Sequence, residues 1–146
     1  MGTKEVQRAS HCVWQIHYHE VFPVKYRKAL LDKEVEQIIV EAAQGISERY
    51  EIGFERIGSD KNHIHLLCSA HPKIAPGKIV RVFKSITAKE IFRKKPEVKR
   101  ELWGGEFWSP GYYVATVGEG ANWDVVERYV SKQGQPREDA RQLTLF

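Results

Sequence analysis

The chain has 146 residues, a net charge of +4 and a pI of about 9.1. This length suits one domain with a real core, and 42% hydrophobic with 29% charged residues is an ordinary globular balance. No apolar stretch approaches the roughly 20 residues of a membrane span, and the N-terminus lacks the apolar segment of a secretory signal. Cys12 and Cys68 are far apart in apolar runs, which indicates buried thiols rather than a disulfide scaffold. We therefore expect a cytoplasmic protein.

The N-terminal third predicts a strand followed by a helix. Residues 12–22 alternate between apolar and polar side chains, which is typical of a strand, and Pro23 ends the pattern. Asp32 is a good N-cap for a helix over residues 33–50, whose apolar residues recur at helical spacing. One face of this helix is therefore expected to pack on a sheet.

The rest of the chain adds three strands and two helices. Residues 52–58 and 63–70 are predicted strands, joined closely enough for a hairpin. A helix is expected over residues 76–95, because Pro76 suits a first helical turn and Lys95-Pro96 stops the pattern. A strand follows over residues 112–117, and a last helix over residues 123–133, with Gly134 at its C′ position.

The order β-α-β-β-α-β plus a final helix predicts an α+β fold of the ferredoxin-like split βαβ type, as in RNA-recognition modules. Its four-stranded antiparallel sheet carries helices on one face and leaves the other face for a ligand or a partner. Residues 1–146 form one domain in this interpretation, with residues 1–10 and 135–146 as flexible or docking tails.

Two histidine pairs have the spacing of a same-face pair on a strand. His63 and His65 flank Ile64, so both rings point away from the core side, and two neutral imidazoles can chelate one divalent cation with positions left open. His17 and His19 have the same spacing. Hydrogen-bonded histidines on a sheet surface are the ordinary alternative for either pair, and spacing does not choose between them.

The last predicted helix carries a possible nucleophile. Tyr129 and Gln133 are four residues apart and share a helix face, with Lys132 beside them. A tyrosine hydroxyl can attack a phosphodiester if a metal or base assists it, and a glutamine carbonyl can complete a metal shell. Simple packing of Tyr129 against the apolar stripe of its helix is the alternative.

Basic side chains are candidates for contact with a phosphate backbone, on charge alone. Such an arc is also an ordinary solvated helix face. The candidates are Lys25, Arg27 and Lys28 after the first strand and Lys78, Arg81, Lys84 and Lys89 on the second helix, together with Lys132.

The segment LWGGEFWSPGYY is rich in glycine and aromatic residues. Gly104 and Gly105 allow a tight backbone turn, and Trp103, Phe107 and Trp108 can anchor the loop or stack on bases. Anchoring is the ordinary use. Elsewhere the chain lacks the nucleotide-binding glycine patterns GxxxxGK[ST] and GxGxxG, and it also lacks GxSxG and CxxC. It therefore has none of the usual signatures of ATP hydrolysis, serine hydrolase chemistry or redox work.

Four segments together resemble the small HUH transposases of bacterial and archaeal insertion sequences, the single-tyrosine TnpA type that acts on single-stranded DNA. HUH stands for His-hydrophobic-His, which His63-Ile64-His65 matches, and the resemblance covers about residues 11–134. The segments are VKYRK, NHIHLLCSAHPKIAPGKIVRVFKS, LWGGEFWSPGYYVATVG and ERYVSKQ.

The resemblance implies roles for individual residues. His63 and His65 match the histidine ligands of a catalytic divalent metal, usually Mg²⁺ or Mn²⁺, and Gln133 matches the third ligand. Tyr129 matches the nucleophile. His17 and His19 do not match the motif, although the first and third strands are neighbours in this fold.

The resemblance also implies an activity. The tyrosine attacks a single-stranded end folded into an imperfect hairpin, forms a 5′-phosphotyrosine and later releases it when the strand is rejoined, without a nucleotide cofactor. The family acts as a homodimer, often with the tyrosine helix of one copy completing the site of the other, and 118–120 is a plausible hinge for that exchange. A non-catalytic single-strand binder of the same fold and a domesticated HUH endonuclease are the alternatives.

Overall fold

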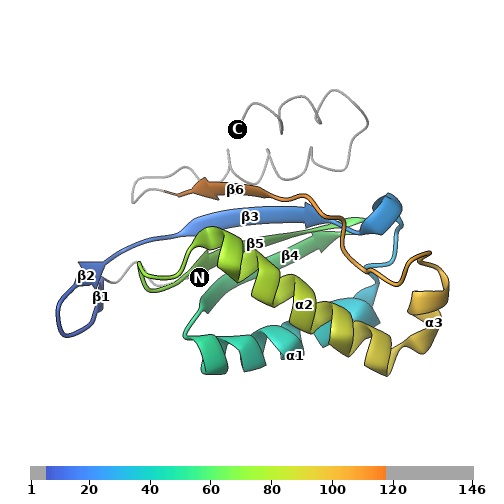
Figure 1. Ribbon diagram of the computed structural model, residues 1–146, viewed down its shortest axis with the longest axis horizontal. Helices are drawn as coiled ribbons and strands as arrows, with labels where there is room; N and C mark the ends of the chain where they lie inside the picture. Colours follow the sequence, from blue (N-terminus) through green and yellow to red (C-terminus); the bar gives the residue numbers. More distant parts are fainter. Residues whose placement is uncertain (1–5, 118–146) are drawn as a thin grey trace.

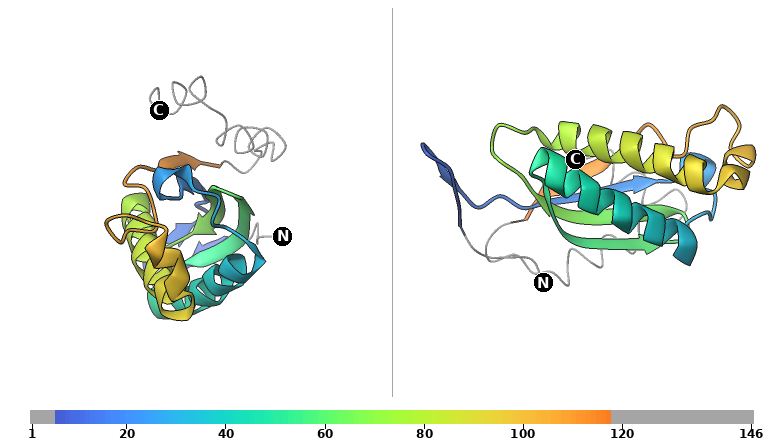
Figure 2. Two further views of the ribbon diagram at one scale, coloured as in Figure 1. Left: turned by 90° about the vertical axis from the view of Figure 1, so that its right-hand side faces the viewer. Right: turned by 90° about the horizontal axis from the view of Figure 1, so that it is seen from below.

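The computed structural model describes residues 6–117, which form a sheet with helices on one face (Figure 1). The main strands are β3 (Tyr18–Pro23), β4 (Gly53–Asp60), β5 (His63–Ser69) and β6 (Tyr113–Thr116), and the helices are α1 (Lys33–Tyr50), α2 (Pro76–Lys94) and α3 (Pro96–Arg100). The four strands are antiparallel in the order β4-β5-β3-β6, and α1 and α2 lie side by side on the same face (Figure 2). This arrangement confirms the predicted α+β fold. The helix predicted over residues 123–133 lies outside the described residues.

Local sequence signals explain both long helices. The side chain of Asp32 accepts a hydrogen bond of 2.9 Å from the backbone N–H of Val35, as expected of an N-cap. Pro76 occupies the first turn of α2, where its missing N–H costs nothing. Each helix buries one apolar stripe against the sheet. No helix within residues 6–117 has both the length and the apolar character needed to cross a membrane.

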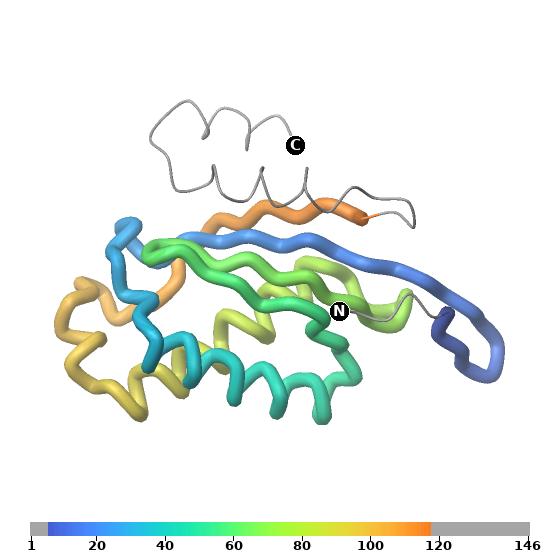
Figure 3. The backbone as a smooth tube through the Cα atoms, turned by 180° about the vertical axis from the view of Figure 1, so that it is seen from behind, coloured from blue at the N-terminus to red at the C-terminus, as the bar shows by residue number. Residues whose placement is uncertain are grey.

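The first predicted strand, residues 12–22, is interrupted in the structure. Only β3 belongs to the main sheet, while β2 (Val13–Trp14) pairs with β1 (Gln7–Arg8), within the tail expected over residues 1–10. The resulting hairpin extends past the end of the sheet (Figure 3). Tyr18 faces Cys68 near the end of β5, and the last bond on the other side runs from the N–H of Val117 to the carbonyl of His17 at 2.8 Å, so β3 pairing ends there and the preceding residues form their own hairpin.

The aromatic segment after α3 anchors itself in the core through two of its three aromatic residues. Phe107 and Trp108 are buried, and the Trp108 ring lies 5.0 Å from that of Phe22. The indole N–H of Trp108 donates to the hydroxyl of Thr87 at 2.9 Å, so its polar atom is satisfied inside the core. Trp103 is different, because 85% of it is exposed. The prediction of anchoring is thus confirmed for Phe107 and Trp108 and is wrong for Trp103.

A carboxyl group is buried on the helix-covered face of the sheet. Glu20 lies on β3 with no exposed surface; one oxygen accepts a weak hydrogen bond from Cys68 Sγ at 3.5 Å, and Oε2 has no partner among the described residues. Burial disfavours the charged form and raises the pKa of Glu20 to about 7, against a small opposing effect of the Cys68 contact. The folded protein therefore keeps a proton here that the unfolded chain releases near pH 4.5.

This proton makes stability fall as pH rises. Between about pH 4.5 and 7 the folded state binds the proton and the unfolded state does not, so the free energy of unfolding decreases by up to about 3 kcal/mol and then levels off. We expect Glu20→Gln to remove this dependence, with its advantage over wild type larger at pH 8 than at pH 5. Urea unfolding followed by circular dichroism at pH 5 and pH 8 measures the free energy of unfolding of each protein. Glu48→Gln, which changes an exposed carboxyl group, is the control. Parallel pH profiles for Glu20→Gln and wild type would contradict the assignment.

Candidate active site

The strand β5 displays His63 and His65 on the face of the sheet opposite the helices. Ile64 and Leu66, which alternate with them, are part of the apolar core. His63 is buried and His65 is half-buried. The predicted same-face pair is therefore present, on a central strand that is hydrogen-bonded on both sides.

Asn62 orients the first of these rings. Its Oδ1 lies 2.9 Å from Nδ1 of His63, so Nδ1 carries the proton and donates it. In a neutral imidazole the other nitrogen, Nε2, then has the lone pair that a metal ion requires. The backbone carbonyl of Asn62 is itself held, because it accepts a hydrogen bond of 2.8 Å from the N–H of Val24. The contact with the side-chain carbonyl oxygen of Asn62 is thus compatible with a His63 tautomer whose Nε2 could face a metal ion, and it fixes the ring in place.

Gly58 provides the space for the second ring. It lies directly opposite His65 in the pairing of β4 with β5. A Cβ at residue 58 would be 2.3 Å from Nε2 and 2.4 Å from Cε1 of His65, much closer than real Cβ contacts allow. The imidazole of His65 therefore lies across the backbone of Gly58, in a place that only glycine leaves open.

The second histidine pair, His17 and His19, does not stay together in the structure. His19 lies on the same face as His65, with ring centroids 6.3 Å apart, and it is also 6.4 Å from the ring of Tyr113. Burial, and secondarily the nearby His65, lowers the pKa of His19 to about 4, so its ring is neutral at pH 7. His17 instead contacts a carboxylate oxygen of Glu55 through Nδ1 at 2.5 Å. Only His19 adjoins the site.

The described residues include only part of the ligand set that the resemblance implies. Residues 6–117 contain no group of three or more His, Cys, Asp or Glu side chains that could hold an ion. The same-face pair His63 and His65 fits a divalent ion that retains open positions, since two imidazoles do not close a shell. Tyr129, Lys132 and Gln133, the predicted nucleophile, its basic neighbour and the third ligand, lie outside the described residues.

Several of the candidate basic residues already have protein partners. Lys25 Nζ is 3.1 Å from a carboxylate oxygen of Glu106, and Lys28 Nζ donates to the backbone carbonyl of Glu101 at 2.6 Å. Both contacts are on the surface, where such interactions exchange readily with solvent or ligand.

Lys84 departs from the predicted solvated arc. It is half-buried, and its ammonium group donates to the carbonyls of Ser109 and Gly111 at 2.7 and 2.9 Å. Burial lowers the pKa of Lys84 to about 8. This lysine holds the loop that leads into β6. The exposed Lys78, Arg81 and Lys89 remain on α2, which covers the face of the sheet opposite the histidines, so their contact with DNA stays a prediction.

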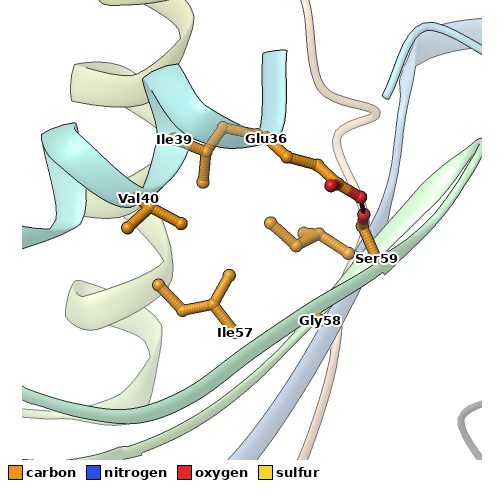
Figure 4. A pocket seen from close by; sticks show the side chains of 7 residues that line it. Glu36, Ile39, Val40, Ile57, Gly58 and Ser59 are labelled. Carbon is orange, nitrogen blue, oxygen red and sulfur yellow. Dashed lines mark hydrogen bonds between the residues drawn. The ribbon is translucent and has the colours of Figure 1, made fainter. Parts of the chain in front are cut away.

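A surface pocket between α1 and β4 is distinct from this site. It is lined mostly by aliphatic side chains, and the carboxylate of Glu36 accepts a hydrogen bond from Ser59 at its rim (Figure 4). Ile64 also lines it, which places it on the core side of β5. The pocket therefore does not open toward His63 and His65.

Two features of the site were not found from the sequence. The role of Asn62 could have been suspected from the sequence, because Asn62 directly precedes His63. Gly58 gave no such signal, because its relation to His65 depends on the strand register.

A split βαβ sheet with a same-face histidine pair on a central strand defines the HUH class of folds and sites. The family model of IS200-like transposases matches residues 12–133. The chain therefore belongs to the IS200-like transposase family, and the resemblance inferred from its motifs is confirmed.

Individual relatives agree with this assignment. The chain is 30% identical over 129 residues to the ISDra2 transposase TnpA of Deinococcus radiodurans, covering 88% of this chain and 91% of that protein. It is 25% identical over 136 residues to the transposase of the IS200 element of Salmonella typhimurium, covering 93% and 88%.

Solved structures show the same fold. A crystal structure of a putative transposase from Deinococcus radiodurans R1 has a TM-score of 0.73 at 26% identity, covering 87% of this chain and 97% of that one. A tyrosine transposase bound to a REP hairpin has a TM-score of 0.55 at 11% identity, covering 80% and 66%. The latter likeness concerns the fold alone.

Proposed function

We propose that this transposase cleaves and rejoins single-stranded DNA at the hairpin-forming ends of an insertion sequence, with a divalent metal ion, Mg²⁺ or Mn²⁺. The observation that supports it most is the pair His63 and His65, displayed on one face of β5 with His63 oriented by Asn62. Membership in the IS200-like transposases supports the action on DNA. The hairpin is the substrate that the resemblance of the motifs implies, and a REP hairpin is what one solved protein of the same fold is bound to.

The proposed reaction exchanges one phosphodiester for another. The hydroxyl oxygen of Tyr129 forms a bond to phosphorus, the bond from phosphorus to the 3′ oxygen breaks, and that oxygen leaves as a 3′-hydroxyl after taking up a proton. The protein then holds a 5′-phosphotyrosine. A 3′-hydroxyl attacks this linkage in the second step and returns the proton to the tyrosine oxygen, so no external energy source is needed.

The remaining residues have supporting roles in this proposal. A divalent ion held by His63, His65 and Gln133 would polarise the scissile phosphate and stabilise its developing charge. Asn62 keeps the lone pair of His63 on Nε2, and Gly58 keeps room for the ring of His65. The active form in this proposal is a homodimer, in which the predicted helix that bears Tyr129 serves the site of the other copy.

Adduct formation tests the metal dependence. Labelled single-stranded DNA from the flanks of the gene is incubated with the full chain and Mn²⁺ or Mg²⁺, then resolved on a denaturing gel. We expect a covalent protein–DNA band that EDTA abolishes and that excess metal restores. His63→Ala is expected to lose this band, and His17→Ala, whose ring contacts Glu55, to keep it.

The outcomes separate the alternatives. Binding without any adduct on any flanking hairpin would favour a non-catalytic single-strand binder. Cleavage without rejoining would favour a domesticated endonuclease. An adduct that forms equally well in EDTA would overturn the role of the metal.

A further inference from the structure

Two aromatic side chains are exposed together at one corner of the molecule. Trp103 is 85% exposed and Tyr26, within the 3-10 turn η1 (Lys25–Arg27), is 54% exposed. The hydroxyl of Tyr26 donates a hydrogen bond of 3.2 Å to the backbone carbonyl of Trp103, so the two segments are joined. Since Phe107 and Trp108 already anchor the loop in the core, the ring of Trp103 is not needed to hold it.

The backbone of this corner adopts conformations that side chains normally avoid. Tyr26 and Arg27 have φ values of 59° and 51°, in the left-handed region that favours glycine. Next to Trp103, Gly104 and Gly105 have φ values of 88° and 73°. Strain of this kind in non-glycine residues persists where a structure holds a side chain in a particular place, as at binding sites. Here it presents the ring of Tyr26 to solvent.

Two lysines lie at this corner. Lys25 Nζ lies 5.5 Å from the centre of the Tyr26 ring, and Lys28 reaches the backbone of Glu101, two residues before Trp103. The carboxylate of Glu106 is also present, paired with Lys25 at 3.1 Å, but it is 65% exposed and the pair is open to exchange. Aromatic faces next to ammonium groups suit a ligand with both bases and phosphates.

The corner continues directly into the histidine site. Pro23 faces His63 across the sheet, and the N–H of Val24 donates to the carbonyl of Asn62 at 2.8 Å. The N–H of Lys25 then donates to the carbonyl of Phe107 at 2.8 Å, which ties the aromatic loop to the same place. These bonds bring the turn that carries Tyr26 and the loop that carries Trp103 to the end of the sheet at which His63 begins β5.

We propose that Trp103 and Tyr26 form a stacking site for an unpaired base of the single-stranded DNA substrate, next to the phosphate held at His63 and His65. Lys25 and Lys28 contact the backbone on either side of that base. This inference rests on the proposed function and deepens it, because it names a subsite for the strand. The rings position the strand and take no part in the bond exchange.

Binding by single-stranded oligonucleotides in EDTA tests the site apart from cleavage. Base stacking on one aromatic ring makes a change of about tenfold or more in affinity when the ring is removed. We expect Trp103→Ala and Tyr26→Ala each to weaken binding by about that factor, and Trp103→Phe to retain most of it. Tyr112→Ala is the control matched to Tyr26→Ala, because its ring has a similar exposure (48% against 54%) and contacts Lys84 instead of this corner; it is expected to bind like wild type.

A scan with single abasic sites identifies the base itself. Wild type is expected to lose affinity when one particular position lacks its base, and Trp103→Ala to be insensitive to the loss at that position, because the two changes remove the same contact. If Trp103→Ala loses as much affinity for a blunt duplex as for a single strand, stacking on an unpaired base is wrong. If Trp103→Ala binds DNA like wild type but has a different sedimentation coefficient, the stacking proposal is overturned and Trp103 belongs to an interface between protein chains.

The two proposals fail in different ways. If wild type forms covalent adducts but Trp103→Ala binds the oligonucleotide within about twofold of wild type, well below the stacking effect, only the stacking site is wrong. If wild type forms no adduct and yet binds in a manner that depends on Trp103, the proposed reaction is wrong and the stacking site stands.

Discussion

Tyr129→Phe is expected to abolish the covalent protein–DNA adduct while binding of the same DNA is retained. Phenylalanine keeps the ring and lacks the oxygen that would bond to phosphorus, so no intermediate can form. The measurement is the labelled band on a denaturing gel, with affinity determined in parallel in EDTA. An adduct that persists in Tyr129→Phe would assign the nucleophile to another residue, and peptide mapping of the labelled band would identify it.

Mixed dimers show whether Tyr129 serves its own copy or its partner. Neither Tyr129→Phe nor His63→Ala is expected to form an adduct alone. If the tyrosine acts in trans, a mixture of the two variants regains adduct, and the label is attached only to the His63→Ala chain, which still has the tyrosine. A size tag on one variant distinguishes the chains. If the mixture stays inactive although mixed dimers form, the tyrosine acts within its own copy.

Gly58→Ala is expected to reduce the rate of metal-dependent cleavage by up to about a hundredfold, since a displacement of about 1 Å in the site can cost that factor. The added methyl group would lie 2.3 Å from Nε2 of His65, so the imidazole must move. The fold is expected to remain, because the position does not have the positive φ at which alanine is strained. Adduct rates measured against Mn²⁺ concentration report the change, and circular dichroism reports the fold.

Gly45→Ala is the matched control for this substitution. Gly45 lies within α1, and a Cβ there would meet no atom within 4 Å. Because alanine favours helix, this variant is expected to gain up to about 1 kcal/mol of stability with unchanged adduct formation. A Gly58→Ala protein with wild-type rate and metal dependence would show that His65 does not act from the position seen in the structure.

The parts of the site that follow from local sequence were predictable. Alternation along β5 placed His63 and His65 on one face, and Asp32 began α1 as expected. Contacts between distant segments were not predictable. Gly58 matters because of its register with His65, and Lys84 left the solvated arc because two carbonyls of the loop before β6 accept its hydrogen bonds.

The alternation of apolar and polar residues over residues 12–22 is longer than the strand β3 that forms within it. The pattern is continuous, but the partner strand β5 ends near the level of Tyr18, so the chain pairs elsewhere. The same alternation put Glu20 on the core side, where charge is unexpected. Composition alone does not reveal such a residue.

The position of Ile64 ties the spacing of His63 and His65 to the integrity of the core. Its side chain is 1% exposed and packs in the core, while His63 and His65 lie on the other face of the sheet. Insertion or deletion of one residue in β5 would exchange the faces and bury imidazoles where an aliphatic chain belongs. Such a change would disturb the core and the histidine face together, so the length of β5 between His63 and Ser69 is constrained from both sides of the sheet.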